Sequence, residues 1–270
     1  MSQATATGYA DVVDLQRYPI DALDSERGRA LVAACRDELR RAGVCQLPGF
    51  VVRDAVDRLV AQTTELASHA FRTDNTHTVY FEPADDSVPA GHPRTAQQRS
   101  AKQTIACDRI PVDSPIRRLY ASDDLTRFIA AVLGKNELHR SADPLDAVMI
   151  ALFDDGDELG WHFDRSEFAV TILYQDATEG GHFDYYPGLR SDESENYAGV
   201  QRVLEGDGEG VIRLASGPGT LAIFHGRCAL HRVSPTAGPR PRINSVLTYG
   251  ERPDMRLNKL TQDLFYGRNR

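Results

Sequence analysis

The chain has 270 residues, of which 41% are hydrophobic and 26% are charged, enough to bury the core of one large domain. Its formal net charge of −8 argues against a nucleic-acid partner, because proteins that bind nucleic acids usually present a basic surface. The sequence contains no apolar run long enough for a membrane span, no secretory signal, and four cysteines without a CxxC pair, which together predict a reduced, cytoplasmic protein.

Helical periodicity dominates the first half of the chain. Apolar residues recur at helical spacing over residues 24–41 and again over 52–70, so both segments are predicted to be amphipathic helices. Gly43 is expected to end the first helix, and residues 44–50 have the composition of a short strand. Residues 115–133 also have a helical pattern, in two pieces.

After Pro144 the pattern changes to that of strands. Six short segments rich in β-branched and aromatic residues are separated by Gly, Asp or Pro, as in a β-sandwich or barrel. The acidic stretch 191–209 interrupts them and is expected to be an exposed loop with one short helix. Helices followed by strands predict an α+β fold in which 1–270 form a single domain, with about 1–140 as helical support and lid and about 141–270 as the β core. The six predicted strands are 145–153, 168–174, 181–186, 210–214, 219–224 and 243–249.

The stretch GWHFDRSEF, residues 160–168, contains a candidate metal site. Side chains two apart on a strand point to the same face, so His162 and Asp164 can occupy adjacent positions around a metal ion. His231, beside a later predicted strand, is the preferred third ligand, and His225 is the alternative. Two histidines and one carboxylate form the facial triad of non-haem Fe(II) oxygenases. The competing interpretation is that each histidine is an ordinary core or surface residue, the commoner case for any single histidine.

Arg242 is a candidate anion-binding residue. It lies inside the strand-like segment PRINSVLTY, a short distance after His231. A guanidinium on a barrel strand is costly to bury without a partner, and a carboxylate that accepts two hydrogen bonds would supply one. The alternative is a surface salt bridge, and Arg240 is the other arginine of this segment that can take the same role.

Three motifs, in this order, make residues 147–254 resemble the Fe(II)/2-oxoglutarate-dependent oxygenases: DDGDELGWHFD, EGGHFDYYPG and GPGTLAIFHGRCALHRVSPTAGPRPRIN. The resemblance implies a double-stranded β-helix, or jelly-roll, core buttressed by the N-terminal helices. It also implies a dioxygenase that uses Fe(II), 2-oxoglutarate and O2 to oxidise an unactivated C–H bond. The implied metal ligands are His162, Asp164 and His231, and the implied 2-oxoglutarate residues are Arg242, Asn244 and Thr248.

A narrower similarity is to the BesD-like amino-acid hydroxylases and radical halogenases. It is carried by the spacing of Arg242, by PRINSVL and by GHPR at residues 91–94. The halogenases have a glycine where this chain has Asp164, so the resemblance implies a hydroxylase. Phe153 is a departure, because many members have a tyrosine there that donates a hydrogen bond to the cosubstrate.

The substrate residues are expected in and near an irregular lid. Residues 73–99 contain three prolines and no period, which is typical of a binding loop, and His92 and Arg94 are its candidate substrate residues. Arg165 stands where the halogenases tend to have an acidic residue, which favours a polar or acidic free amino acid over lysine as the small-molecule substrate. The alternatives are a peptidyl or carrier-bound residue, or a non-enzymatic, cupin-like metal-binding protein. No membrane partner is expected, and the oligomeric state stays open, with a homodimer as one option.

Overall fold

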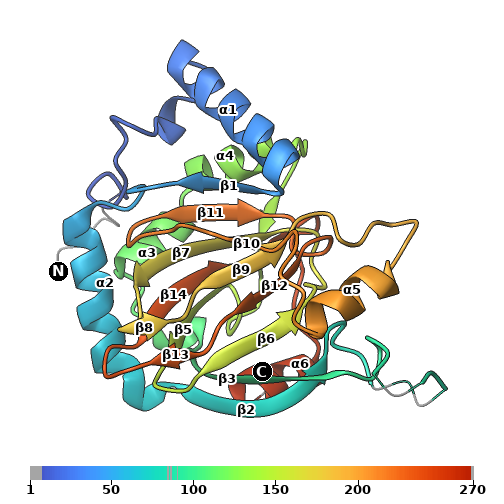
Figure 1. Cartoon of the computed structure of the whole chain (residues 1–270). Helices are drawn as coiled ribbons and strands as arrows, with labels where there is room; N and C mark the ends of the chain where they lie inside the picture. The colour runs from blue at the N-terminus through green and yellow to red at the C-terminus, as the bar shows by residue number, and fades with distance from the viewer. Residues whose placement is uncertain (1–7, 84, 86, 90, 269–270) are drawn as a thin grey trace.

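The core of the protein is a curved antiparallel sheet, visible in the computed structural model of Figure 1, which describes residues 8–83, 85, 87–89 and 91–268. Eleven strands of the described chain form it: β1 (Val44–Leu47), β2 (Phe71–Thr78), β3 (Gln97–Ile105), β5 (Val148–Phe153), β6 (Glu158–His162), β7 (Ala169–Gln175), β9 (Phe183–Tyr186), β10 (Ile212–Arg213), β11 (Leu221–Phe224), β12 (Leu230–Val233) and β14 (Arg242–Leu247). Their order is β1-β11-β7-β14-β5-β3-β6-β12-β9-β10, with β2 beside β3.

Two short strand pairs complete the β structure. The strand β13 (Thr236–Ala237) pairs with β8 (Glu179–Gly180), and β15 (Tyr249–Gly250) pairs with β4 (His139–Arg140). The strands β8, β13 and β15 directly follow β7, β12 and β14, and β4 precedes β5, so both pairs lie beyond the ends of main-sheet strands.

The sheet curls so that its two halves face each other. Phe153 on β5 packs in one buried cluster with Val233 on β12 and with Phe183 on β9, although these strands are well separated along the sheet. A curled antiparallel sheet with its inner face closed in this way is a jelly-roll core, so the predicted α+β fold with a double-stranded β-helix is confirmed.

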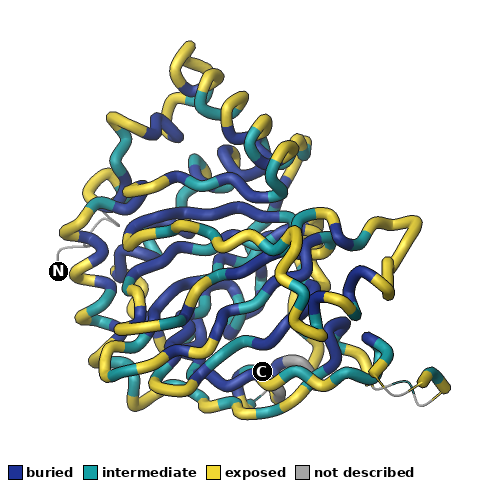
Figure 2. Tube along the Cα trace, in the orientation of Figure 1, coloured by how far each residue is buried: buried dark blue, intermediate teal, exposed yellow. Residues whose placement is uncertain are grey.

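Helices cover the outer face of the β1–β5 half of the sheet, as predicted. Ser25 caps the first long helix by accepting a hydrogen bond from the Gly28 backbone, and Gly43 ends it in a left-handed conformation (φ 72°) that glycine adopts without strain. Figure 2 shows the central strands buried and the outer side of this helix exposed. The helices are α1 (Glu26–Ala42), α2 (Arg53–Leu66), α3 (Pro115–Tyr120), α4 (Asp123–Leu133), α5 (Tyr197–Leu204) and α6 (Lys259–Tyr266), with short 3-10 turns at Ile20–Ala22, Ala67–His69 and Cys107–Arg109. No helix among the described residues combines the length and the apolar character needed to cross a membrane.

The predicted irregular lid is shorter than expected. Its first residues, from Thr73 to Thr78, belong to β2, and its last, from Gln97 to Arg99, belong to β3, so only the connection between the two strands is irregular. Almost all side chains of both strands are polar, whether exposed or buried, so the strands lack the apolar period that identifies a strand from sequence. The structure also contains α6 and β12, which the sequence analysis did not predict as elements, and the strand expected to hold both His162 and Asp164 is β6, which ends at His162.

Candidate metal centre and cavity

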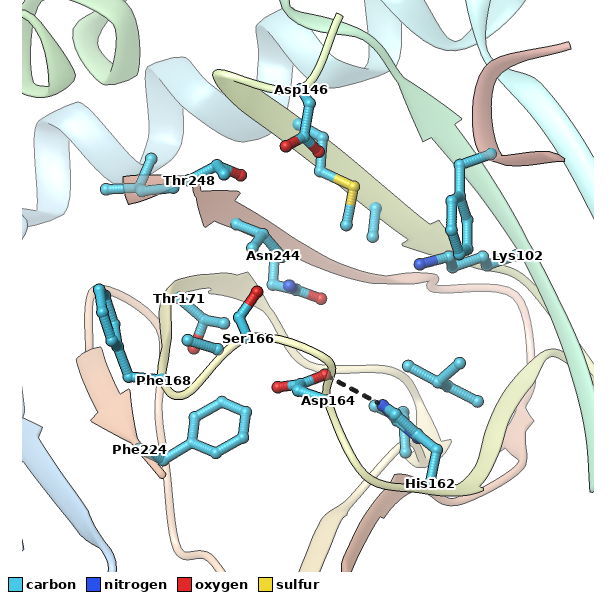
Figure 3. A pocket seen from close by; sticks show the side chains of 18 of the residues that line it. Lys102, Asp146, His162, Asp164, Ser166, Phe168, Thr171, Phe224, Asn244 and Thr248 are labelled. Carbon is cyan, nitrogen blue, oxygen red and sulfur yellow. Dashed lines mark ion pairs between the residues drawn. The ribbon is translucent and has the colours of Figure 1, made fainter. Parts of the chain in front are cut away.

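His162, Asp164 and His231 come together at one point inside the curled sheet. Their potential ligand atoms all lie within 4.8 Å of one another. Asp164 Oδ1 is 3.7 Å from His162 Nε2 and 3.6 Å from His231 Nε2, and the two imidazole rings are 4.1 Å apart. Figure 3 shows His162 and Asp164 pointing toward each other at the edge of a cavity. The arrangement fits a divalent metal held on one face, with the other face open.

Strand pairing positions the two histidines. His162 is the last residue of β6 and lies directly opposite His231 on β12, so the two side chains project from neighbouring strands to the same side. Both are almost fully buried, at 3% exposure. The two histidines are therefore brought together because they are cross-strand partners, although they lie 69 positions apart in the sequence.

Asp164 reaches the site from a loop, not from the strand. The strand β6 ends at His162, so Asp164 does not lie on the same strand. The two side chains do meet, as expected, but strand alternation is not the cause. The Asp164 backbone N–H donates to the Gly226 carbonyl (3.0 Å), which holds the loop against the turn before β12. A Cβ at Gly226 would lie 1.9 Å from Asp164 Oδ2, so only glycine leaves room for this carboxylate.

Backbone carbonyls orient both imidazoles. His162 Nδ1 lies 2.8 Å from the Gly160 carbonyl and His231 Nδ1 lies 2.9 Å from the Ala229 carbonyl, so each Nδ1 carries the proton and each Nε2 is left with its lone pair. Burial lowers the pKa of His162 well below its ordinary value, which keeps its ring neutral. Neutral imidazoles with Nε2 directed at a carboxylate are what metal coordination requires.

A cavity of about 450 Å³ adjoins the triad. Its floor is apolar and aromatic, and a few charged and polar side chains project into it, the usual composition of a small-molecule site. Besides the triad, its polar and charged lining residues include Lys102, Ser141, Asp146, Ser166, Thr171, Arg242, Asn244, Thr248, Tyr249, Arg256 and Tyr266.

Arg242 is the buried cation at one side of this cavity. It is 9% exposed, its guanidinium donates to the Asn244 side-chain oxygen and lies 5.6 Å from the Phe153 ring. Burial lowers the pKa of Arg242 to about 10, and within the described chain no carboxylate forms an ion pair with it. Asn244 and Thr248 line the same cavity. The alternative, Arg240, instead donates to the Ala177 carbonyl outside this cavity.

The expected substrate residues lie around a second cavity. This cavity of about 560 Å³ is lined by Arg94 and Arg165, and Asp164 borders both cavities. Arg94 is already paired with Asp85 at 2.9 Å, and Arg165 donates to the Phe81 carbonyl at 2.6 Å. These two arginines are therefore near the candidate metal centre, but each already has a partner.

His92 and His225 are not brought into the site. The His92 ring packs 4.6 Å from Tyr197 and its Nδ1 accepts from the Arg94 backbone, and His92 lines neither of the two cavities. His225 is half-buried in the turn before β12, and the metal-ligand cluster found in the described residues does not include it.

Three charged residues of the main cavity were missed by the sequence analysis: Arg256, Lys102 and Asp146. Lys102 on β3 and Asp146 before β5 both project into the main cavity (Figure 3). Burial lowers the pKa of Lys102 to about 8 and raises that of Asp146 to about 6. A lysine in a polar strand and an aspartate before an apolar one carry no motif, so only the three-dimensional arrangement identifies them.

The jelly-roll fold and the two-histidine, one-carboxylate triad together define an Fe(II)/2-oxoglutarate-dependent oxygenase. Within this class, residues 28–265 match the family described as Halogenase D, and the chain belongs to that family. No curated protein sequence matches the chain significantly.

Solved structures of the same class share the fold at low sequence identity. An oxidoreductase of the 2OG-Fe(II) oxygenase family from Burkholderia pseudomallei is 18% identical, with 83% of this chain and 92% of that one covered and a TM-score of 0.51. The epimerase SnoN, in complex with Fe3+, alpha ketoglutarate and nogalamycin RO, is 17% identical over 83% and 84% of the chains, with a TM-score of 0.55. A prolyl hydroxylase from Trichoplax adhaerens, in complex with a peptide fragment of hypoxia inducible factor, is 14% identical over 80% and 88%, with a TM-score of 0.52.

Proposed function

We propose that the protein is an Fe(II)- and 2-oxoglutarate-dependent hydroxylase of a small polar molecule, a free amino acid or a close derivative. The observation that carries the proposal is the complete triad beside a cavity that also contains an unpaired, buried guanidinium. A metal site alone would suit many proteins. A metal site next to a guanidinium that has no carboxylate partner suits an enzyme with a dicarboxylate cosubstrate.

Different side chains bind the metal and the cosubstrate. His162, Asp164 and His231 hold Fe(II), and the iron with its 2-oxo acid and O2 supplies the oxidising power to break a C–H bond. Arg242, oriented by Asn244, binds the distal carboxylate of 2-oxoglutarate. Because the apolar walls of the cavity exclude water, this ion pair is stronger than it would be at the surface.

Asp164 favours hydroxylation over halogenation within the Halogenase D family. Its carboxylate occupies the ligand position that a halide would need, and its backbone is anchored to Gly226. The wild-type enzyme is therefore expected to add oxygen, and to give no chlorinated product at high chloride concentration. Mass spectrometry of the product in chloride-containing buffer distinguishes the two outcomes.

The substrate approaches from the side of the second cavity. Arg94 and Arg165 lie there next to Asp164, and His92 supports Arg94 through its backbone. In this proposal Arg94 exchanges Asp85 for the substrate carboxylate. Arg94→Ala should then lower product formation by more than tenfold and leave slow, uncoupled succinate release.

The cosubstrate assignment is tested with Arg242. Removing one partner of a buried, hydrogen-bonded ion pair costs about 2–5 kcal/mol, so Arg242→Ala should weaken 2-oxoglutarate binding by more than tenfold. Arg240→Ala is the matched control, since it removes the same group outside the main cavity. Calorimetric titration with 2-oxoglutarate measures both variants. Equal affinity in Arg242→Ala and wild type would contradict the assignment.

The decisive experiment is a substrate screen. Purified protein with Fe(II), 2-oxoglutarate and O2 is incubated with free amino acids and with peptides, and succinate and a mass gain of one oxygen are measured. Turnover of free amino acids supports the proposal. Turnover of peptides alone would favour the second candidate, an oxygenase of peptidyl or carrier-bound residues, to which the fold shared with the peptide-bound prolyl hydroxylase lends support. Absence of any succinate would favour a non-enzymatic metal-binding protein.

A further inference from the structure

Lys102 is a buried cation without a partner. It is 7% exposed, and Figure 3 shows its ammonium directed into the main cavity. Its Nζ lies 5.9 Å from the centroid of the Phe265 ring, and within the described chain no hydrogen bond or ion pair satisfies the ammonium. Burying an unpaired ammonium is costly, so its retention in a ligand cavity points to a ligand that supplies the missing anion.

The carboxylates near Lys102 are already used by other groups. Asp146 accepts a hydrogen bond from the Tyr266 hydroxyl at 2.9 Å. Asp164 belongs to the metal triad. Both carboxylates act on Lys102 through space, but neither forms an ion pair with it. The ammonium therefore has all its hydrogen-bond donors available to a ligand.

The position of Lys102 separates it from the cosubstrate residue. The charges that act on Lys102 are those of Asp164 and Asp146, whereas the charge that acts on Arg242 is that of Asp176. Lys102 on β3 and Arg242 on β14 therefore stand on different strands with β5 between them, and of the two cations it is Lys102 that is coupled to the charge of Asp164. In the proposed function, 2-oxoglutarate uses one carboxylate at the metal and the other at Arg242. Neither carboxylate is then available to pair with the Lys102 ammonium.

We propose that Lys102 binds an anionic group of the substrate, and that the enzyme therefore acts on an acidic small molecule of the amino-dicarboxylate class. This inference rests on the proposed function. One carboxylate of the substrate contacts Lys102 in the main cavity. The rest of the molecule passes Asp164, which borders both cavities, toward the arginines of the second one.

The first test compares acids with their amides. Aspartate, glutamate and 2-aminoadipate are titrated calorimetrically into the anaerobic enzyme loaded with Fe(II) and 2-oxoglutarate, alongside asparagine, glutamine and lysine. At least one acid should bind at least tenfold more tightly than its amide, or than lysine in the case of 2-aminoadipate. Tenfold corresponds to about 1.4 kcal/mol.

Lys102→Met should abolish this preference, because methionine keeps the length and apolar character of the side chain and removes only the charge. Lys259→Met is the matched control, since Lys259 is exposed at the start of α6 and should keep the preference. Lys102→Gln, which keeps a hydrogen-bond donor, guards against a folding defect specific to one variant. Iron content and 2-oxoglutarate affinity should be unchanged in all three.

Proton uptake on acid binding is a second measurement. It would show no change if Lys102 had only a structural role. An anion bound at Lys102 raises its depressed pKa, so binding near pH 8 should take up protons in the wild type and not in Lys102→Met. Asp146, Asp164 and His77 are the other titratable groups whose charges couple to Lys102, and all three remain in the variant. Titration in two buffers of different ionisation enthalpy measures the difference.

Three results would overturn the inference while leaving the proposed function intact. The first is acid binding that is unchanged in Lys102→Met. The second is a loss of 2-oxoglutarate affinity in this variant, which would make Lys102 a cosubstrate residue. The third is normal binding of iron and 2-oxoglutarate with no acid bound. Failure of iron or 2-oxoglutarate to bind the wild type would instead refute the proposed function itself.

Discussion

At the scale of single residues, the candidate metal centre depends on a glycine that is not a ligand. Gly226 accepts the backbone hydrogen bond of Asp164 and has no side chain to collide with its carboxylate. The neighbouring histidines are held by a strand pair, which is rigid, whereas Asp164 is held by a loop. The carboxylate is consequently the ligand whose position is easiest to disturb.

Gly226→Ala should displace Asp164 without removing any ligand. The new Cβ would lie 1.9 Å from Asp164 Oδ2 and 2.9 Å from Asp164 Cβ, so the Asp164 loop itself must shift. Because the overlap is confined to Asp164, the fold should survive while iron affinity falls by about tenfold or more. Gly217→Ala is the control, because a Cβ there would meet nothing within 4 Å. Fe(II) titration of both variants checks the prediction. Equal iron affinity in the two would mean that Asp164 does not depend on this glycine.

Lys102 should lower the stability of the protein near neutral pH. Its pKa is about 8 in the folded protein and 10.5 as a free side chain, so between these values the unfolded state binds more protons and stability rises with pH. Below pH 8 the full penalty of the buried charge is present. Lys102→Met should therefore be more stable than wild type by about 2–3 kcal/mol at pH 7 and by about 1 kcal/mol or less at pH 10. Urea unfolding at both pH values tests this, and a variant less stable than wild type at pH 7 would assign Lys102 a structural role.

At the scale of secondary-structure elements, the β2–β3 hairpin is attached to the strand that carries His162. The Arg72 guanidinium on β2 donates twice to Asp157, which lies in the turn before β6 and is fully buried. A second arginine of the hairpin, Arg99, pairs with Asp74 in an exposed position. Both arginines connect the hairpin to the segment that leads into β6. Arg72 does so through the buried Asp157 carboxylate, and Arg99, which is exposed, through the Gly156 carbonyl and Glu158.

Arg72→Met should destabilise the protein by about 1–3 kcal/mol, because it leaves the buried Asp157 carboxylate without its counter-ion. The effect is below that of a fully buried pair, since the Arg72 side chain is 45% exposed. Arg99→Met should cost less than about 1 kcal/mol. Urea unfolding at neutral pH compares the two variants, and equal destabilisation would show that burial of Asp157 does not matter.

The elements that the sequence predicts are those with an apolar period or a clear end signal. The helix α1 has both and α2 has the apolar period, and the apolar strands β7, β11 and β14 lie where short β-branched runs predict them. The strands β2 and β3 are missed because their side chains are polar on both faces, including the buried Ser100, Lys102 and Thr104 of β3. The metal triad is predictable because its residues belong to motifs, whereas Lys102 and Asp146 become neighbours only through the curl of the sheet.

At the scale of the whole molecule, the N-terminal part of the chain is not a detachable support. The strand β1 pairs with β11, and β3 pairs with both β5 and β6, so strands from the first 140 residues complete the sheet formed by the rest. Breaking the chain near residue 140 would leave unpaired strand edges and exposed apolar surface on both pieces.

Unfolding should therefore be a single cooperative transition. The calorimetric and van't Hoff enthalpies should agree, and fragments 1–140 and 141–270 expressed separately should not fold. Saturating Fe(II) with 2-oxoglutarate should raise the midpoint temperature of this one transition, because both bind only the folded chain. Two resolved transitions in differential scanning calorimetry would contradict this picture and indicate two independent units.

The chain's single tryptophan stands beside the metal centre. Trp161 immediately precedes His162, and the guanidinium of Arg232, which immediately follows His231, lies 4.6 Å from its ring. The ring is buried in a cluster with Val79 of the lid and with residues of α5. All indole emission of this protein thus originates next to one metal ligand, His162, and from a ring that packs against the neighbour of a second, His231. Changes in Trp161 fluorescence should therefore report metal binding, and any movement of the lid, without an added label.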